Sequence, residues 1–189
     1  MAFATALCDA NTLYPAPIRD LLVRLGISGV VRLRWTEAIH EEWIRSVLAD
    51  RHDLTRTQLE RTRALMDRAV QDCLIRDYEH RIEGLELPDP EDRHVLAAAI
   101  VGGVQRILTF NTRDFPPAAV APFGIEVQDP DAFILELLDA RRERLLEALR
   151  EQRSALRDPL LSAEQLLTAL GKAGLVRSAH ELASFVAQL

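Results

Sequence analysis

The sequence predicts an α/β fold, in which a mainly parallel sheet carries helices on both faces, followed by a helical extension. Two observations favour this class. Short β-prone apolar segments alternate with helical segments in the order β-α-β-α-α-β-α-β across the first 130 residues, an alternation typical of parallel sheets. After residue 130 only helical spacing remains. We therefore predict a first domain at residues 1–130 and a helical extension at residues 131–189.

The composition bounds the class of protein before any motif is considered. Of 189 residues, 48% are hydrophobic and 5% aromatic, so a full core can form and must be mainly aliphatic. No apolar run approaches the roughly 18 residues that cross a bilayer, and the N-terminus lacks the basic region of a signal peptide. Cys8 and Cys73 lack metal-ligand spacing and fit reduced core thiols. We therefore expect a cytoplasmic protein without membrane contact.

Charge and motifs exclude several function classes. The formal net charge of −6 argues against a protein that coats nucleic acid through bulk electrostatics. It does not exclude a nuclease, because bound cations offset the charge of catalytic carboxylates. The chain contains no GxGxxG, GxxxxGK[ST], GxSxG or HExxH motif, and its five histidines are dispersed, which argues against a zinc site.

The first elements are a strand, a turn, a helix and a second strand. The apolar segment FATALCD (3–9) is β-prone and ends at an aspartate, and ANTLYPAP (10–17) is turn-like. Apolar residues recur at helical spacing in IRDLLVRLGIS (18–28). GVVRLRW (29–35) alternates apolar and basic residues, which predicts a strand with one solvated face.

Two amphipathic helices and a short strand candidate follow. TEAIHEEWIRSVL (36–48) predicts a helix with Thr36 near its N-cap. Its apolar positions form one stripe: Ile39, Trp43 and Val47. LTRTQLERTRALMDRAV (54–70) predicts a second helix with several arginines among its polar positions, and DCLIRD (72–77) is a short strand candidate.

The last elements of the predicted first domain are a helix, a strand, a loop and a strand. DRHVLAAAIVGG (92–103) is the helix and RILTF (106–110) the strand; NTRDFPP (111–117) is the loop, and GIEVQ (124–128) a last strand candidate. In the extension, residues 132–156 predict one long, heavily charged amphipathic helix. A break at DPLLS (158–162) precedes two short helices around Gly171 and Gly174.

The segment PDPEDRHVLAAAI allows two interpretations. Asp89 is a candidate N-cap and Pro90 a first helical residue, with Glu91 and Asp92 as anions at the positive end of the helix dipole. Alternatively, one of these acids faces a bound metal. DPDAF (129–133) has the same shape without apparent chemistry, so the segment alone favours the capping interpretation.

Several acids are predicted to lie at one edge of the sheet. Asp9 directly follows the first strand, Asp92 opens the helix before the strand at 106–110, and Asp114 lies in the loop after that strand. The helix after the second strand offers three further acids: Glu37, Glu41 and Glu42. Because ligands of an open parallel sheet bind beyond the carboxyl ends of its strands, we expect these acids to approach one another.

Clustered carboxylates at a sheet edge indicate metal-dependent hydrolysis of a phosphodiester. Mg²⁺ and Mn²⁺ prefer carboxylate oxygen, and one or two such ions can activate a water, orient the phosphate and stabilise the leaving oxygen. Each acid also has a structural alternative. Asp9 and Asp114 are compatible with turn residues, and Glu41 and Glu42 with solvated helix positions.

Four motifs occur in order along the first 130 residues: LCDANTLYP, TEAIHEEW, DPEDRHVLAAAI and ILTFNTRDFP. Together they resemble the PIN-domain ribonucleases, particularly the VapC-like toxins of bacterial toxin–antitoxin pairs. The last two motifs, with the small-residue helix between them, are the most specific. The resemblance implies a three-layer α/β/α sandwich, a pocket of acids that binds Mg²⁺ or Mn²⁺, and endonucleolytic cleavage of RNA.

The resemblance also implies the roles of individual residues. The catalytic and metal-binding acids are Asp9, Glu42, Asp92 and Asp114. Glu42 stands six residues after Thr36, as the glutamate of the family does after its strand-end Ser or Thr, while Glu41 remains open. Supporting residues of the site are Asn11, Thr109 and Asn111. Arg93 and His94 are candidates for RNA contact, although surface charge for Arg93 and packing or capping for His94 are the simpler interpretations.

The resemblance finally implies partners: an RNA substrate, a cognate antitoxin protein and a second copy of the chain in a homodimer. The extension departs from the minimal plan of the family, and its role as a dimer contact, an antitoxin-docking element or a packed brace is open. Two alternative functions are a PIN nuclease outside any toxin pair, acting in RNA processing or on structured DNA, and a non-catalytic binding module. Retention of all four acids disfavours the binding module.

Overall fold

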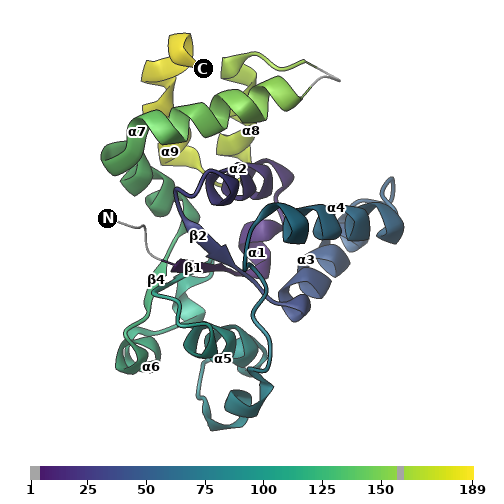
Figure 1. Ribbon diagram of the computed structural model, residues 1–189, viewed down its shortest axis with the longest axis vertical. Helices are drawn as coiled ribbons and strands as arrows, with labels where there is room; N and C mark the ends of the chain where they lie inside the picture. The colour runs from purple at the N-terminus through teal and green to yellow at the C-terminus, as the bar shows by residue number, and fades with distance from the viewer. Residues whose placement is uncertain (1–4, 157–159) are drawn as a thin grey trace.

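A four-stranded parallel sheet forms the centre of the molecule (Figure 1). The structure is a computed structural model that describes residues 5–156 and 160–189. Its strands are β1 (Thr5–Cys8), β2 (Arg32–Arg34), β3 (Arg106–Leu108) and β4 (Glu126–Gln128). Their order across the sheet is β2-β1-β3-β4, and every strand pair within the described residues is parallel. The predicted α/β class with a parallel sheet is therefore confirmed.

The register of the two inner strands determines where the candidate acids start. Cys8 of β1 pairs with Leu108 of β3, so the next residues, Asp9 and Thr109, leave the sheet side by side at its carboxyl edge. The backbone N–H of Asp9 donates to the Leu108 carbonyl at 3.0 Å, which extends the pairing past the strands. β1 is buried almost throughout, as expected for an inner strand covered on both faces.

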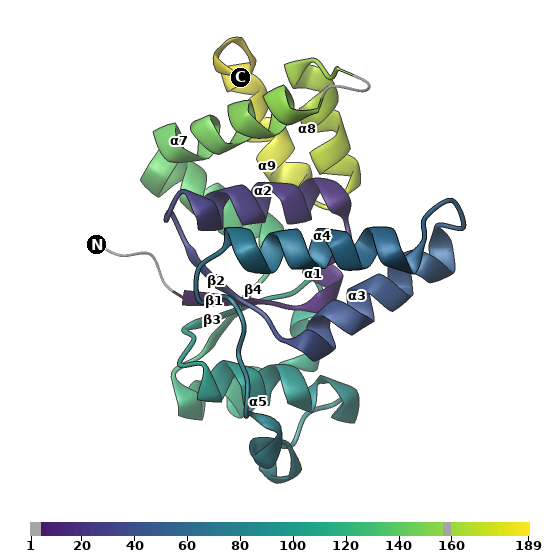
Figure 2. The same cartoon turned by 45° about the vertical axis from the view of Figure 1, so that its right-hand side comes forward.

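Helices cover both faces of this sheet (Figures 1 and 2). α2 and the C-terminal helices lie on one side of it, and α5 lies on the opposite side. The helices up to residue 120 are α1 (Ala10–Leu13), α2 (Ala16–Ile27), α3 (Glu37–Asp50), α4 (Arg56–Ala69), α5 (Arg93–Val101) and α6 (Pro117–Val120). Short 3-10 helices lie between them: η1 (Glu79–Gly84), η2 (Pro90–Asp92), η3 (Thr112–Asp114) and η4 (Ala121–Phe123).

Two predicted segments differ from the observed elements. DCLIRD is not a strand, because only Leu74 forms a parallel bridge with Trp35; the segment leaves the sheet edge after that single contact. The predicted turn after the first strand contains the one-turn helix α1, because the Asp9 carboxylate accepts the Ala10 N–H and so starts a helix. Phe3 and Ala4 of the predicted first strand lie outside the described residues.

The helix α3, which carries Glu42, is fixed at its start and along its length. Thr36 is its N-cap and accepts the Ile39 N–H at 3.1 Å, as predicted. The predicted apolar stripe is buried: Ile39, Trp43 and Val47. The helix therefore holds one face against the core, and its polar face is left to approach the sheet edge.

A buried polar network also joins α3 to α4. The Asp67 carboxylate of α4 accepts the Trp35 indole N–H at 2.8 Å and lies 2.9 Å from His40 Nε2. His40 Nδ1 accepts the Trp43 indole N–H at 2.9 Å, so Nε2 carries the proton toward Asp67. Burial lowers the pKa of His40 and outweighs the opposing effect of the Asp67 carboxylate, so the neutral ring is favoured. The hydrogen bond between His40 and Asp67 joins α3 to α4.

The C-terminal extension consists of α7 (Pro130–Ala155), α8 (Ala163–Lys172), α9 (Val176–Leu182) and the 3-10 helix η5 (Ala183–Gln188). The long helix and the helix pair after it agree with prediction; α7 bends at Arg141, which has non-helical backbone angles. Asp158 and Pro159 of the predicted break lie outside the described residues. No helix within the described residues has the length and apolar composition needed to span a membrane.

Helices after residue 130 pack directly against α2. α7 and α8 contact α2, and the Gln152 side chain of α7 donates to the Pro17 carbonyl at the start of α2 at 2.8 Å. Figures 1 and 2 show the extension lying along α2 on the side of the sheet away from α5. The division into domains at residue 130 stays a prediction; α7 begins at that point and bends at Arg141.

Candidate functional site

Asp9 is the most constrained acid at the carboxyl edge of the sheet. It is 5% exposed, and its Oδ2 accepts hydrogen bonds from Asn11 Nδ2 and Thr109 Oγ1, both at 2.8 Å. Its Oδ1 accepts the Ala10 N–H at 2.7 Å. Burial raises the pKa of Asp9, although the hydrogen bonds from Thr109 and Ala10 oppose that rise. The carboxylate is thus held in one orientation, which is what a ligand to a cation requires.

Asn11 and Thr109 are hydrogen-bonded to each other and to Asp9. Asn11 Nδ2 donates to Thr109 Oγ1 at 2.9 Å, and Asn11 Oδ1 accepts the Phe110 N–H at 3.0 Å. The Asn111 N–H donates to Thr109 Oγ1 at 3.1 Å. Asn111 takes part through its backbone, and its exposed position leaves its side chain at the rim of this network.

Glu42 and Glu41 are separated by the geometry of α3. Glu42 is half-buried, and its Oε1 lies 2.8 Å from His94 Nε2 at the start of α5. Glu41 is exposed and forms a two-pronged ion pair with Arg56 of α4, at 3.0 and 3.2 Å. Glu42 lines the same cavity as Asp9, whereas Glu41 is paired with Arg56 of α4.

The capping and metal interpretations of PDPEDR fall on different residues. Asp89 is the N-cap, and its carboxylate accepts the Glu91 N–H at 2.8 Å. Asp92 stands at the start of α5 but makes no capping hydrogen bond. In DPDAF the equivalent cap is Asp129, which accepts from Asp131 and Ala132. Asp89 therefore caps the start of the helical segment, and the Asp92 carboxylate has no capping role.

The remaining predicted site residues lie at different depths. Asp114 lies half-buried in η3, and its charge acts on Asp92. His94 lines the pocket with Glu42. The Arg93 guanidinium donates instead to the Pro90 carbonyl at 2.9 Å, so it closes the 3-10 turn.

A cavity of about 320 Å³ lies at the carboxyl edge of the sheet. Of the predicted residues, those that line it are Asp9, Asn11, Glu42, Asp92 and His94. Four of the predicted residues are not among those that line it: Arg93, Thr109, Asn111 and Asp114. Sequence reasoning missed five polar residues as lining residues of this cavity: Tyr14, Arg45, Ser46, Asp89 and Glu91. Arg45 and Ser46 follow Glu42 by about one helical turn, so the i+3 and i+4 spacing from that acid was the signal that could have found them.

The electrostatics of the cavity favour a cation. Burial, together with the charges of Asp9 and Asp114, raises the pKa of Asp92 to about 6. Burial lowers the pKa of His94, but its hydrogen bond to Glu42 and the nearby carboxylates outweigh burial and the pKa is raised. The carboxylates lie so close together that ionisation of Asp92 is disfavoured. A bound cation would reduce the repulsion between them and favour the ionised form of Asp92.

The donor set fits a hydrated Mg²⁺ or Mn²⁺ better than a closed metal site. Within residues 5–156 and 160–189, no three His, Cys, Asp or Glu side chains are arranged to hold an ion between them. Mg²⁺ does not require such a cage, because it retains several waters and binds through one or two carboxylates. Asp9 and Asp92 would be the direct holders, with Glu42 and Asp114 acting through water.

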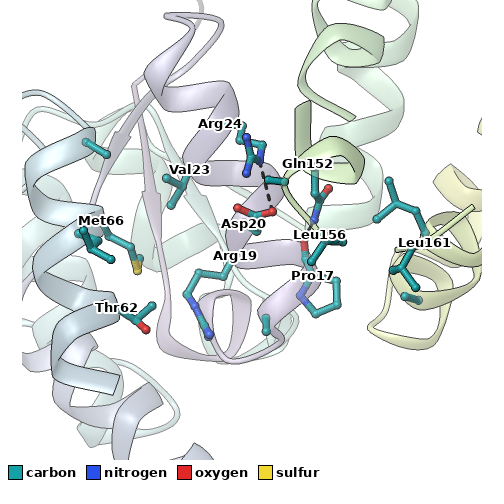
Figure 3. A pocket seen from close by; sticks show the side chains of 16 residues that line it. Pro17, Arg19, Asp20, Val23, Arg24, Thr62, Met66, Gln152, Leu156 and Leu161 are labelled. Atoms are coloured by element: carbon teal, nitrogen blue, oxygen red, sulfur yellow. Dashed lines mark hydrogen bonds and ion pairs between the residues drawn. The ribbon is translucent and has the colours of Figure 1, made fainter. Parts of the chain in front are cut away.

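A second cavity of about 580 Å³ lies between α2, α4 and the extension (Figure 3). Its walls are mainly apolar, and of its charged residues Asp20 and Arg24 pair with each other at 3.3 Å. Figure 3 shows Met66 on one wall and Leu156 and Leu161 on the other. Although this cavity is larger, Asp20 is the one carboxylate among the described residues that line it, so it offers no group of acids to a cation.

The comparisons with known proteins agree with this architecture. The chain matches the family model of the PIN domain over residues 5–113 and that of the VapC50 C-terminal domain over residues 130–184. It is 38% identical over 82 residues to a Mycobacterium tuberculosis (strain ATCC 25618 / H37Rv) protein named "Putative ribonuclease VapC50". The alignment covers 43% of this chain and 48% of that protein, so the chain spans about half the length of the curated relative it matches. No solved structure matches the chain.

Since the PIN domain match covers more than half of the chain and includes Asp9, Glu42 and Asp92, the chain belongs to the PIN domain family.

Proposed function

We propose that the protein is a Mg²⁺- or Mn²⁺-dependent endoribonuclease that acts as the toxin of a toxin–antitoxin pair. The observation that carries the proposal is the cavity in which Asp9, Glu42 and Asp92 meet at the carboxyl edge of the sheet. The name of the relative, which describes a ribonuclease, supports RNA as the substrate. The match to the VapC50 C-terminal domain supports the toxin role.

The residues that line the cavity have different roles in the proposed reaction. A bound divalent cation supplies Lewis-acid chemistry and offsets the charge of the carboxylates. Three hydrogen bonds fix the Asp9 carboxylate, so it would present its oxygens to the cation in one orientation. Asp92 has a pKa of about 6 in the free protein, so near neutral pH its carboxylate is mainly ionised and available to hold the cation. Arg45, on the wall of the cavity, is placed to contact a phosphate.

The alternative functions are separable from the leading one. A PIN nuclease outside a toxin pair would cleave RNA or structured DNA without arresting growth. A non-catalytic binding module would have no use for a carboxylate held at a raised pKa beside other acids, because that arrangement costs stability without aiding recognition. The cavity therefore favours a nuclease over a binding module.

Purified protein is expected to cleave single-stranded RNA in the presence of Mg²⁺ or Mn²⁺ and to lose that activity when EDTA is added. Gel electrophoresis of an end-labelled RNA would measure the cleavage, and re-addition of Mn²⁺ should restore it. Cleavage that persists in EDTA would contradict the metal-dependent mechanism. A structured DNA of the same length serves as the substrate control, and preferential DNA cleavage would favour the second nuclease function.

Expression in a bacterial host is expected to arrest growth, whereas the Asp9→Asn variant should not, because an amide cannot replace the fixed carboxylate. Colony counts after induction would measure the effect, and immunoblots should show equal amounts of both proteins. A small neighbouring reading frame whose product restores growth would supply the antitoxin. Cleavage in vitro without growth arrest would place the nuclease outside a toxin pair.

A further inference from the structure

The extension reaches the candidate site through the turn between α8 and α9. Gly174 in this turn has a φ of +125°, a conformation that residues with a side chain rarely adopt. A Cβ placed on Gly174 would lie 2.7 Å from Cζ and 2.9 Å from Cε1 of Phe110. The backbone of the turn is therefore seated on the Phe110 ring so closely that only glycine fits.

Phe110 belongs to the hydrogen-bonded support of Asp9. Its backbone N–H donates to Asn11 Oδ1 at 3.0 Å, and the Asn11 Nδ2 group donates to Asp9 Oδ2 at 2.8 Å. The preceding residue, Thr109, donates to the same Asp9 oxygen. A displacement of Phe110 would consequently be transmitted through Asn11 and Thr109 to the carboxylate.

The turn that contacts Phe110 is itself held at its far end. The buried Asp131 carboxylate of α7 accepts the Ser178 N–H at 2.8 Å and the Arg177 N–H at 3.0 Å, both at the start of α9. Ser178 Oγ also donates to Asp131 Oδ1. The clamp fixes the first turn of α9 on α7, so the Gly174 turn cannot withdraw from Phe110 without breaking buried hydrogen bonds.

We propose that the extension is a positioning element of the nuclease site. Through the contact of Gly174 with Phe110, it holds Asn11 and Thr109 in the geometry that orients Asp9. Gly174 and Phe110 are positioning residues, since neither lines the acidic cavity. The proposal rests on the proposed function only where it concerns RNA cleavage; the effect on the geometry of Asn11 stands independently.

The test begins with the Gly174→Ala variant in the full chain. The added methyl group would displace the Phe110 ring, and we expect the turnover of RNA to fall by roughly 10- to 100-fold, the scale of a small misplacement of a catalytic group. The KM for RNA should be unchanged, because the RNA-contacting surface is untouched. The Mn²⁺ affinity, measured by calorimetry without RNA, should weaken, and the Asn11 side-chain amide signal should shift in a two-dimensional NMR spectrum.

Two further variants separate the contact from backbone strain. Gly29→Ala is the matched control, because Gly29 has a φ of +69° with no atom within 4 Å of an added Cβ; it should lose stability and keep its turnover. Phe110→Leu removes the ring atoms that the methyl group would meet. The double variant should therefore be no less active than Phe110→Leu alone, a coupling expected only of residues in contact.

The outcomes are distinguishable. Unchanged turnover, Mn²⁺ affinity and Asn11 signal in both Gly174→Ala and Phe110→Leu would overturn the proposal. Additive losses in the double variant would also overturn it, because they would assign the effect to strain in the turn. If Gly174→Ala does not fold, Phe110→Leu carries the test alone. If the wild-type chain cleaves no RNA, the proposed function fails, while the Asn11 signal still decides whether the extension positions this network.

Discussion

Replacing Asp92 by asparagine is expected to lower the RNA cleavage rate by about 10²- to 10³-fold, the cost of removing one preorganised charge from an active site. The melting temperature should stay unchanged or rise. Asp92 makes no capping hydrogen bond, and its raised pKa shows that the fold is strained by its charge. Single-turnover cleavage and thermal unfolding of the same preparations would measure the two effects.

The control for this substitution is Asp129→Ala, which removes a helix cap outside the acidic cavity. Asp129 occupies the same place in DPDAF as Asp89 does in DPEDR and accepts two backbone N–H groups at the start of α7. We expect this variant to lose about 1 kcal/mol of stability, the usual cost of replacing an N-cap by alanine, and to retain full activity. A destabilised but active Asp92→Asn protein would show that Asp92 is a structural acid.

Asp92 also gives the metal-free protein a characteristic pH dependence. An unfolded aspartate ionises near pH 4, whereas the folded Asp92 keeps its proton up to about pH 6. The folded state therefore binds more protons in this interval, and the free energy of unfolding should decrease as the pH rises from 4 to 6. Added Mn²⁺ should reduce or reverse that decrease, since the cation favours the ionised form. Urea titrations at several pH values would measure the slope.

The second large effect is expected from Asp131→Ala, which should lower the free energy of unfolding by about 3 kcal/mol. The substitution leaves the N–H groups of Arg177 and Ser178 without their carboxylate acceptor, while the Ser178 hydroxyl keeps the Asp131 carbonyl as its acceptor. For a chain of this length the melting temperature should fall by roughly 6–12 °C. Asp139→Ala, on the exposed side of the same helix, is the control and should be close to neutral.

The Asp131 clamp should fail in acid. Burial raises the pKa of Asp131, but the hydrogen bonds from Ser178 and Arg177 outweigh burial and the pKa is lowered. Its contribution is therefore complete above the pKa of an unfolded aspartate, near 4, and is lost as the pH falls through the lower value of the folded state. Asp131→Ala should accordingly unfold with less dependence on pH below 4 than the wild type.

Features that depend on neighbouring residues were predictable from the sequence. The strand ending at Asp9, the N-caps Thr36 and Asp89, and the apolar stripe of α3 all follow from local spacing. The parallel arrangement then placed the ends of β1 and β3 together, because carboxyl ends of parallel strands share one edge. The choice of Glu42 over Glu41 was available only as a resemblance, and the ion pair of Glu41 with Arg56 supplies a geometric reason for it.

Features that depend on distant residues were not predictable. DCLIRD has the composition of a strand, but the chain leaves the sheet edge after one bridge. Asp131 resembles a simple helix-start anion, yet its carboxylate binds backbone 46 and 47 residues away. The pairing of His94 with Glu42 likewise joins two helices. No local pattern encodes such pairs, since their partners are selected by packing.

The hydrogen bond from Thr109 to Asp9 spans 100 residues of sequence, and this has a consequence for synthesis of the protein. A ribosome adds about 5–20 residues per second, so roughly 5–20 s separate the appearance of these two residues. The support from the α8–α9 turn is made later still, when most of the chain has been translated. The acidic cavity is lined by residues between Asp9 and His94, but its support from Gly174 cannot form before the α8–α9 turn has been translated. If the proposals above are correct, the nascent chain carries the cavity before it carries the contact that positions Asp9.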